Sequence, residues 1–146
     1  LVLMDYGCQY KGYLSDMTRT VVLGKATPKQ REVYELEKQM VADCEAVIKA
    51  GATGREAYEA SIRAIKGTEY FDYHYTGIGH GIGMFVHEVP FMGPSSSAVF
   101  EAGNVITVEP GIYIPGWGGV RIEDEVLITE NGCENLISAT KELIEL

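Results

Sequence analysis

Apolar and polar residues at the start of the chain follow the pattern of two β-strands joined by a turn. The run LVLMDYG comes first, QYKGY supplies turn-forming residues, and SDMTRTVVLG follows with many β-branched side chains. Such runs bounded by turn residues are typical of a hairpin. The pattern predicts antiparallel arms at Leu1–Gly7 and Leu14–Leu23 with a turn near Gln9–Gly12.

Two segments with helical spacing come next. Thr27 and Pro28 provide an N-cap and a proline at the first helical position, so they mark the start of a helix. Apolar residues recur at near-helical intervals over Lys29–Ala50, and a glycine follows. Thr53 and Glu56 have the spacing of a capping box, which predicts a second helix that ends before the next glycine.

The second half of the chain returns to strand-like patterns. Residues 69–93 are rich in aromatic residues and glycine, and the segments VITVEPGIYIP and GGVRIEDEVLIT alternate like hairpin arms around Pro115–Gly119. Residues 137–146, ISATKELIEL, predict a short final helix. Helices beside antiparallel strands, without a repeat or linker, predict a single α+β domain.

Two acidic pairs stand out in these predicted hairpins. The first hairpin would set Asp5 opposite Asp16, and the second would set Glu109 opposite Glu123. Like charges directly opposite on a ladder are destabilising, so four converging carboxylates need strong compensation. Divalent cations are the natural source of it, and the pattern therefore predicts a metal site.

Composition narrows the class of protein. The net charge is −9, and the 12 Lys and Arg residues are scattered rather than clustered, which argues against a nucleic-acid partner. No run of apolar residues is long enough to span a membrane, so no membrane association is expected. The three cysteines are odd in number and lack CxxC spacing. Reduced thiols in a cytoplasmic protein are the plain interpretation.

The glycine-rich run GIGHGIG does not fit a nucleotide-binding loop. Neither glycine register places a third glycine where the dinucleotide fingerprint needs one, and no GKS or GKT follows. The glycines instead surround one imidazole, His80, and a second histidine, His87, follows seven residues later. Phe91 occupies the position of the second histidine in an HExxH motif, so a zincin site is excluded.

Four segments together resemble a known family. The runs MDYG…YLSDMTRT, GHGIGMFVHEVP, ITVEPGIYIP and GVRIEDEVLIT, in this order, are similar to the pita-bread metallopeptidases, and within them to the Xaa-Pro aminopeptidase and prolidase branch. The resemblance covers nearly the whole chain. It implies a pita-bread α+β fold, with a curved antiparallel sheet and flanking helices.

The resemblance also implies a two-metal site. The five family ligands correspond to both acidic pairs and one histidine, namely Asp5, Asp16, His80, Glu109 and Glu123. Asp16 and Glu123 would bridge the two ions, Asp5 would hold one ion, and His80 and Glu109 would hold the other. One imidazole among carboxylates suits Mn²⁺, Co²⁺ or Zn²⁺, and the resemblance favours Mn²⁺ or Co²⁺.

The implied reaction is attack of a metal-bridging hydroxide on the peptide bond that precedes a proline in second position. Glu109 would act as general acid and base, and His87 would hydrogen-bond the substrate and stabilise the tetrahedral intermediate. Tyr113 and Arg121 match positions that line the same site. Arg121 could pair with a carboxylate of the substrate or order the metal-binding carboxylates.

Some positions depart from the family pattern or have a plainer interpretation. Relatives often carry a histidine four residues before the metal-binding one, but Thr76 stands there and His74 lies two residues upstream. Trp117 and the aromatic residues of Phe71–Tyr75 could form a proline-accepting wall, although packing is their simpler role. The charged pair that follows Glu123, residues 124 and 125, is expected to face water.

The resemblance leaves some alternatives open. A metal-free hydrolase of the creatinase type and a non-catalytic pita-bread binding module would both be expected to lack metal ligands, and none is missing here. The chain is expected to be the C-terminal part of a catalytic domain whose N-terminal part lies upstream, and this piece alone could be inactive. Full-length relatives often form homodimers. Dipeptidase and aminopeptidase activities are not distinguished by these motifs.

Overall fold

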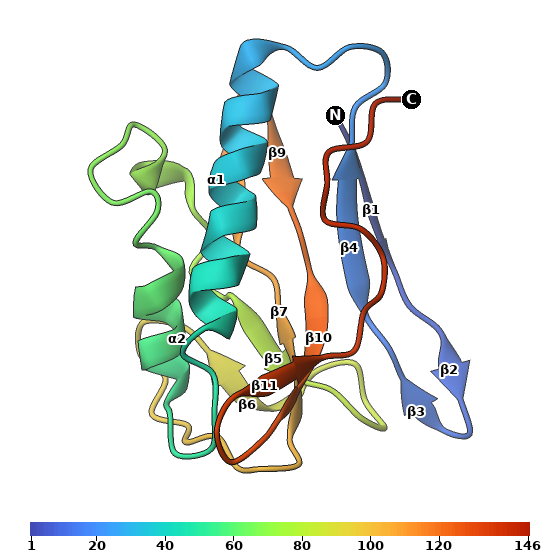
Figure 1. Ribbon diagram of the computed structural model, residues 1–146, viewed down its shortest axis with the longest axis vertical. Helices are drawn as coiled ribbons and strands as arrows, with labels where there is room; N and C mark the ends of the chain where they lie inside the picture. Colours follow the sequence, from blue (N-terminus) through green and yellow to red (C-terminus); the bar gives the residue numbers. More distant parts are fainter.

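Five antiparallel strands form the main sheet, and the two helices pack together against it (Figure 1). The computed structural model describes all of residues 1–146. The strand order across the sheet is β11 (Cys133–Asn135), β10 (Asp124–Ile128), β7 (Val105–Val108), β5 (Gly79–Gly81) and β6 (Glu88–Met92). This arrangement confirms the α+β prediction.

One long interrupted hairpin carries the second acidic pair. Strands β8 (Gly111–Ile114) and β9 (Gly118–Arg121) pair with the same register that joins β7 to β10. Between these ladders, residues 109–110 on one side and 122–123 on the other lie outside any strand. The predicted turn near Pro115–Gly119 is confirmed, because Ile114 pairs with Gly118.

The first hairpin forms as predicted, but its register differs. Strands β1 (Val2–Tyr6) and β4 (Met17–Val21) pair, and β2 (Gln9–Tyr10) and β3 (Tyr13–Leu14) continue to the tip. A tight turn at Lys11 and Gly12, with φ values of 52° and 91°, sets this register. Asp5 therefore faces Thr18 rather than Asp16, so the predicted pairing of the two aspartates was wrong by one position on each strand.

Both helices begin at the predicted caps and end earlier than predicted. Capping boxes start α1 (Pro28–Glu45) and α2 (Gly54–Ser61). Beyond α1 the backbone N–H of Ala50 donates to the Thr129 carbonyl at 3.0 Å, which draws the chain away from the helix axis. The 3₁₀ helix η1 (Phe71–Tyr73) follows α2. Neither α1 nor α2 has the length and apolar character needed to cross a lipid bilayer.

A core of 21 buried residues joins the helices to the sheet. On α1 the inward side chains include Val33, Met40 and Val41, and the sheet contributes Ile106 and Val126 among others. Burial of these apolar surfaces is the main stabilising contribution, at about 25 cal/mol per Å². The core fixes α1 against β7, β8 and β9, the strands of the hairpin that carries the second acidic pair.

The C-terminal segment is extended, which contradicts the predicted short helix. It runs beside β4, where Val22 N–H donates to the Ile144 carbonyl at 2.9 Å and Leu146 N–H donates to the Val22 carbonyl at 2.8 Å (Figure 1). The Arg19 guanidinium takes the carbonyls of Ala139 and Thr140 as acceptors. Strand-like pairing and this arginine occupy backbone groups that a helix would need.

The two acidic residues expected to face water are buried instead. Asp124 is fully buried and forms an ion pair with Arg19 at 2.6 Å, and Lys141 donates to its other carboxylate oxygen. Glu125 is 7% exposed and accepts a hydrogen bond from the Asp16 backbone N–H. Buried charges need partners, and these come from β4, from the residue just before it and from the C-terminal segment, which the strand pattern alone did not reveal.

Candidate metal centre

Glu109 and Glu123 lie opposite each other where the long hairpin loses its own ladder hydrogen bonds. The Glu109 N–H donates to the Ile78 carbonyl and the Glu123 N–H donates to the Thr18 carbonyl, each at 3.0 Å. At the interruption the hairpin therefore bonds to two other segments, one at Ile78 next to β5 and one at Thr18 on β4. Side chains from three separate parts of the sequence meet at this point.

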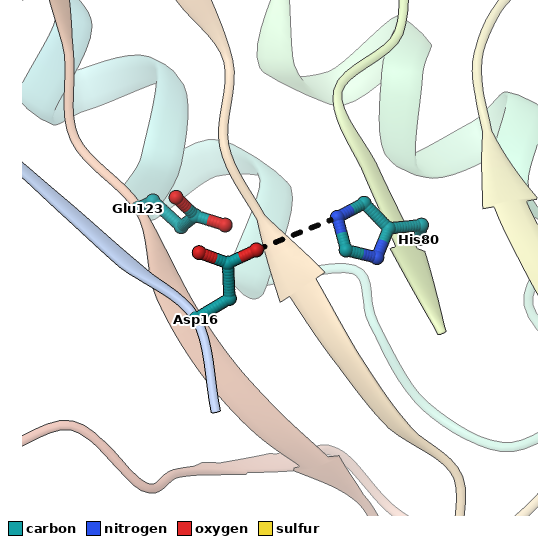
Figure 2. Close-up of side chains that lie close together, drawn as sticks. All are labelled: Asp16, His80 and Glu123. Atoms are coloured by element: carbon teal, nitrogen blue, oxygen red, sulfur yellow. Dashed lines mark ion pairs between the residues drawn. The ribbon is translucent and has the colours of Figure 1, made fainter. Parts of the chain in front are cut away.

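Asp16, His80 and Glu123 form a cluster at this meeting point. One possible ligand atom from each of them lies within 4.8 Å of the others. Figure 2 shows the three side chains pointing toward one another from three segments, with the contact between His80 Nε2 and Asp16 Oδ2 drawn at 4.0 Å. Two carboxylates and an imidazole at this spacing form a donor set for a divalent ion.

The orientation of His80 leaves Nε2 directed at the carboxylates. Its Nδ1 lies 2.9 Å from the Gly81 carbonyl, an acceptor that places the hydrogen on Nδ1. Nε2 lies 3.0 Å from Glu109 Oε1. Burial lowers the pKa of His80, but hydrogen bonding to Glu109 and Gly81 outweighs this effect and the net shift is upward. A metal ion that binds Nε2 would replace the hydrogen bond to Glu109.

A glycine brings the His80 strand close to its neighbour. Gly79 has a φ of 154°, and a Cβ built on it would lie 2.2 Å from the Thr107 carbonyl oxygen. Any other residue would therefore push β5 away from β7. The glycines around His80 in the sequence thus have a steric reason at this position.

Glu123 carries a buried oxygen without a partner. The side chain of Glu123 is 1% exposed, Oε2 accepts a hydrogen bond from Thr18 Oγ1 at 2.6 Å, and Oε1 has no hydrogen-bond partner. Burial, with the nearby charge of Glu109, raises the pKa of Glu123 to about 8. Burial and the charges of Asp5 and Glu109 also raise the pKa of Asp16. An unpaired buried acceptor beside crowded carboxylates is a good fit for divalent metal ions.

Asp5 lies at the edge of this cluster and pairs with an arginine. The Asp5 carboxylate forms an ion pair with Arg121, whose Nη1 donates to the Tyr113 hydroxyl at 3.0 Å. Arg121 Nε also donates to Thr18 Oγ1 at 3.1 Å. Asp16, His80, Glu109 and Glu123 therefore lie close together, and the Asp5 carboxylate lies near both Arg121 and Asp16.

A cavity of about 720 Å³ opens in front of these residues. Its lining includes His80, Glu109 and Arg121 together with the aromatic side chains of Tyr75 and Tyr113. His87 lines the same cavity, and its ring centroid lies 4.3 Å from that of His80. This volume and mixed lining are typical of small-ligand sites.

Two threonines in the site were missed by the sequence interpretation. Thr18 donates to Glu123, and Thr107 Oγ1 donates to Glu109 Oε1 at 3.0 Å while accepting from the His80 N–H. A signal for Thr107 was present, because it lies two residues before Glu109 and alternate residues of a strand share a face. Both threonines are fully buried and fix the carboxylates they bond.

His74 does not line the cavity. Its Nε2 lies 2.8 Å from the Tyr58 hydroxyl and its ring packs against Phe71, so it belongs to the contact between α2 and η1. Trp117 packs partly against the core, in agreement with the packing role considered for it. Among the aromatic residues of Phe71–Tyr75, Tyr75 is the one that lines the cavity.

Comparison with protein-family models identifies the family. The model of metallopeptidase family M24 matches residues 1–130. The chain belongs to metallopeptidase family M24. The M24 relatives include the peptidase YqhT of Bacillus subtilis, which is 49% identical over 150 residues, covering 100% of this chain and 41% of that protein. A Xaa-Pro dipeptidase of Pyrococcus furiosus is 44% identical over 144 residues, covering 99% and 41%.

Solved M24 structures share the fold. The X-Pro aminopeptidase of Thermotoga maritima gives a TM-score of 0.95 at 32% identity, over 99% of this chain and 40% of that chain. A Xaa-Pro dipeptidase from Bacillus anthracis also gives 0.95, at 44% identity, over 99% and 41%. These matches confirm the predicted pita-bread class. The chain spans about 40% of the length of these relatives.

Proposed function

We propose that the protein in its full natural length is a metal-dependent peptidase that hydrolyses Xaa-Pro bonds, and that residues 1–146 are the C-terminal part of its catalytic domain. The observation that carries this proposal is the cluster of Asp16, His80 and Glu123, with its unpaired buried oxygen, at a cavity. Relatives named Xaa-Pro dipeptidase support the choice of substrate. An X-Pro aminopeptidase matches in structure as well as a Xaa-Pro dipeptidase does, so the proposal includes both dipeptides and longer peptides as substrates.

The proposed metal ligands are the five residues predicted from the sequence. Asp16 and Glu123 would be shared by two ions, Asp5 would serve one, and His80 and Glu109 would serve the other. Such ions supply a nucleophile by lowering the pKa of water and polarise the scissile carbonyl. Four carboxylates match the charge of two divalent cations. Mn²⁺ is the proposed metal, with Co²⁺ and Zn²⁺ as alternatives.

The other residues of the cavity suit the handling of a peptide. Glu109 is held by Thr107 and faces His80, where it can accept and return a proton during hydrolysis. His87 lines the same cavity and can donate a hydrogen bond to a developing oxyanion. Arg121 keeps a fixed positive charge beside the carboxylates, and Tyr113 holds its guanidinium in place.

Hydrolysis of Xaa-Pro peptides tests the proposal directly. Full-length protein treated with chelator is expected to be inactive and to regain activity on addition of Mn²⁺, because the nucleophile depends on the metal. Release of proline from Xaa-Pro dipeptides and of the first residue from longer Xaa-Pro peptides would be measured in parallel. If the Mn²⁺-, Co²⁺- and Zn²⁺-reconstituted proteins all fail to cleave either substrate, the enzyme proposal is wrong.

Metal binding is expected to release protons and to strengthen as the pH rises to about 8. Below this pH the Glu123 carboxyl is protonated in the metal-free protein, since its pKa is raised to about 8, and a metal ion must displace that proton. This group alone should tighten the apparent affinity roughly tenfold per pH unit below that value. Calorimetric Mn²⁺ titration in buffers of different ionisation enthalpy measures the proton release. Binding at pH 6.5 without proton release would contradict the prediction.

The proposal also covers the cellular location and the oligomeric state of the full-length protein. Three free cysteines, one of them fully buried, fit a reducing cytoplasmic environment. A homodimer of the full-length protein is proposed from the family resemblance alone. Size-exclusion chromatography with light scattering would test the dimer.

A further inference from the structure

Glu37 is a buried acidic residue that the site described above does not use. It lies on α1 one turn after Val33 and one turn before Val41, within the apolar stripe that packs against the sheet. Its exposed fraction is 0%, and neither of its carboxylate oxygens has a hydrogen-bond partner. An unpaired buried polar group costs about 2–7 kcal/mol depending on the reference state. An apolar residue at this position would avoid that cost.

The segment opposite Glu37 carries the candidate metal centre. The Ile122 N–H faces the carboxyl group but does not reach hydrogen-bonding geometry. Ile122 is fully buried and lies outside any strand, between Arg121 and Glu123. Burial raises the pKa of Glu37 well above its ordinary range, despite the opposing effects of the Ile122 N–H and the Arg121 charge.

Ile122 lies between two residues of the candidate metal centre, so a small shift of its backbone would move both. Arg121, the residue before it, contacts Asp5, Tyr113 and Thr18 through its guanidinium group. Glu123, the residue after it, carries the unpaired oxygen of the metal cluster. The β9 ladder ends at Arg121, and Glu123 is held from the other side by Thr18. The face of Ile122 toward α1 is therefore a place where the helix can set the position of this segment.

We propose that Glu37 is a positioning residue of the metal centre: its carboxyl group on α1 packs against the Ile122 backbone N–H and thereby sets where Arg121 and Glu123 stand. This inference rests on the proposed metallopeptidase function. Displacement of a catalytic group by about 1 Å can cost a hundredfold in rate, so a buried polar contact behind the site can be worth its cost in stability.

The test compares Glu37→Leu and Glu37→Gln in the full-length protein, with Met40→Leu as the control. Met40 is fully buried on the same helix and carries no polar group that could act on the Ile122 N–H. Glu37→Leu is expected to raise Tm, because it removes two unpaired oxygens, and to weaken Mn²⁺ affinity and lower kcat by roughly 10- to 100-fold with KM little changed. Glu37→Gln keeps a polar group of the same shape, so it should retain most of the wild-type Mn²⁺ affinity and kcat.

The outcomes separate positioning from packing. A Glu37→Leu protein with a raised Tm and unchanged Mn²⁺ affinity and kcat would show that Glu37 has no role in the site. Parallel loss of Tm, affinity and activity without rescue by Gln would show a role in folding only, and would also overturn the proposal. Calorimetric Mn²⁺ affinity is measured without substrate. If the wild-type protein binds Mn²⁺ but cleaves no Xaa-Pro peptide, the function fails while the affinity series still tests Glu37.

Discussion

Replacement of Glu123 by glutamine should abolish most of the proposed peptidase activity while stabilising the metal-free protein. Gln keeps the shape and the hydrogen bond from Thr18 but cannot bind two cations as a carboxylate does. We expect kcat/KM to fall by roughly 10³-fold, the scale at which loss of one preorganised charge-stabilising group is measured. Mn²⁺ affinity should fall in the same preparation.

The stability of this variant follows from the raised pKa of Glu123. Between its ordinary pKa of 4.5 and the folded value of about 8, the carboxyl is ionised in the unfolded chain and protonated in the folded one. The unfolded state therefore binds fewer protons, and the folded metal-free protein loses stability as the pH rises through this window. Glutamine does not ionise, so the variant does not lose this stability. We therefore expect its free energy of unfolding at pH 7 to exceed that of the wild type by on the order of 1–3 kcal/mol. The gain should vanish near pH 4.

Urea unfolding of chelated protein at pH 4 and pH 7, together with the peptide assay, measures both effects. Glu134→Gln is a suitable control, because Glu134 is exposed on β11 and lies in neither the cluster nor the cavity. It should change neither quantity. Wild-type activity and Mn²⁺ affinity in Glu123→Gln would remove Glu123 from the proposed ligand set.

The sequence could predict the second acidic pair because its register depends on local turn geometry. The turn around Pro115–Gly119 pairs Ile114 with Gly118, and the same register continues across the gap to β7 and β10. Glu109 and Glu123 therefore fall opposite each other by counting alone. In the first hairpin the turn lies at Lys11 and Gly12, one position later than the arithmetic assumed, and the aspartates are offset.

Long-range partners explain what the sequence could not predict. The segment ISATKELIEL has helical spacing, but its carbonyls accept hydrogen bonds from Arg19 and from Val22, which follows β4, more than a hundred residues away. The strand pattern likewise placed Asp124 at the surface, because alternation does not show that another element covers that face. The apolar stripe of α1 suggested only packing, and the unpaired carboxyl of Glu37 within it became visible once its burial was known.

Asp124 gives the largest expected effect on stability. Removal of one partner from a buried ion pair costs about 3–5 kcal/mol, because the other charge is left buried and unpaired. Arg19 is 6% exposed and would lose its only carboxylate partner in Asp124→Ala. We therefore expect a decrease of about 3–5 kcal/mol in the free energy of unfolding, or roughly 10 °C in Tm for a domain of this size. Lys25→Ala, which removes an ion pair at a side chain that is 91% exposed, should leave Tm unchanged.

The stabilisation by Asp124 should also depend on pH. Burial alone would raise its pKa, but hydrogen bonds from Lys141, Asn135 and Arg19 hold it below the ordinary value. A lowered folded pKa means that the stabilisation is present above the unfolded pKa of about 3.9 and is lost as the pH falls through the folded value. Urea unfolding from pH 7 to pH 2 should therefore show the wild type and Asp124→Ala converging in acid. The double variant Arg19→Met, Asp124→Leu leaves no unpaired charge of this pair. At pH 7 it should recover much of the free energy of unfolding that Asp124→Ala loses. An equal loss in the single and double variants would show that the ion pair is not the reason for the stabilisation by Asp124.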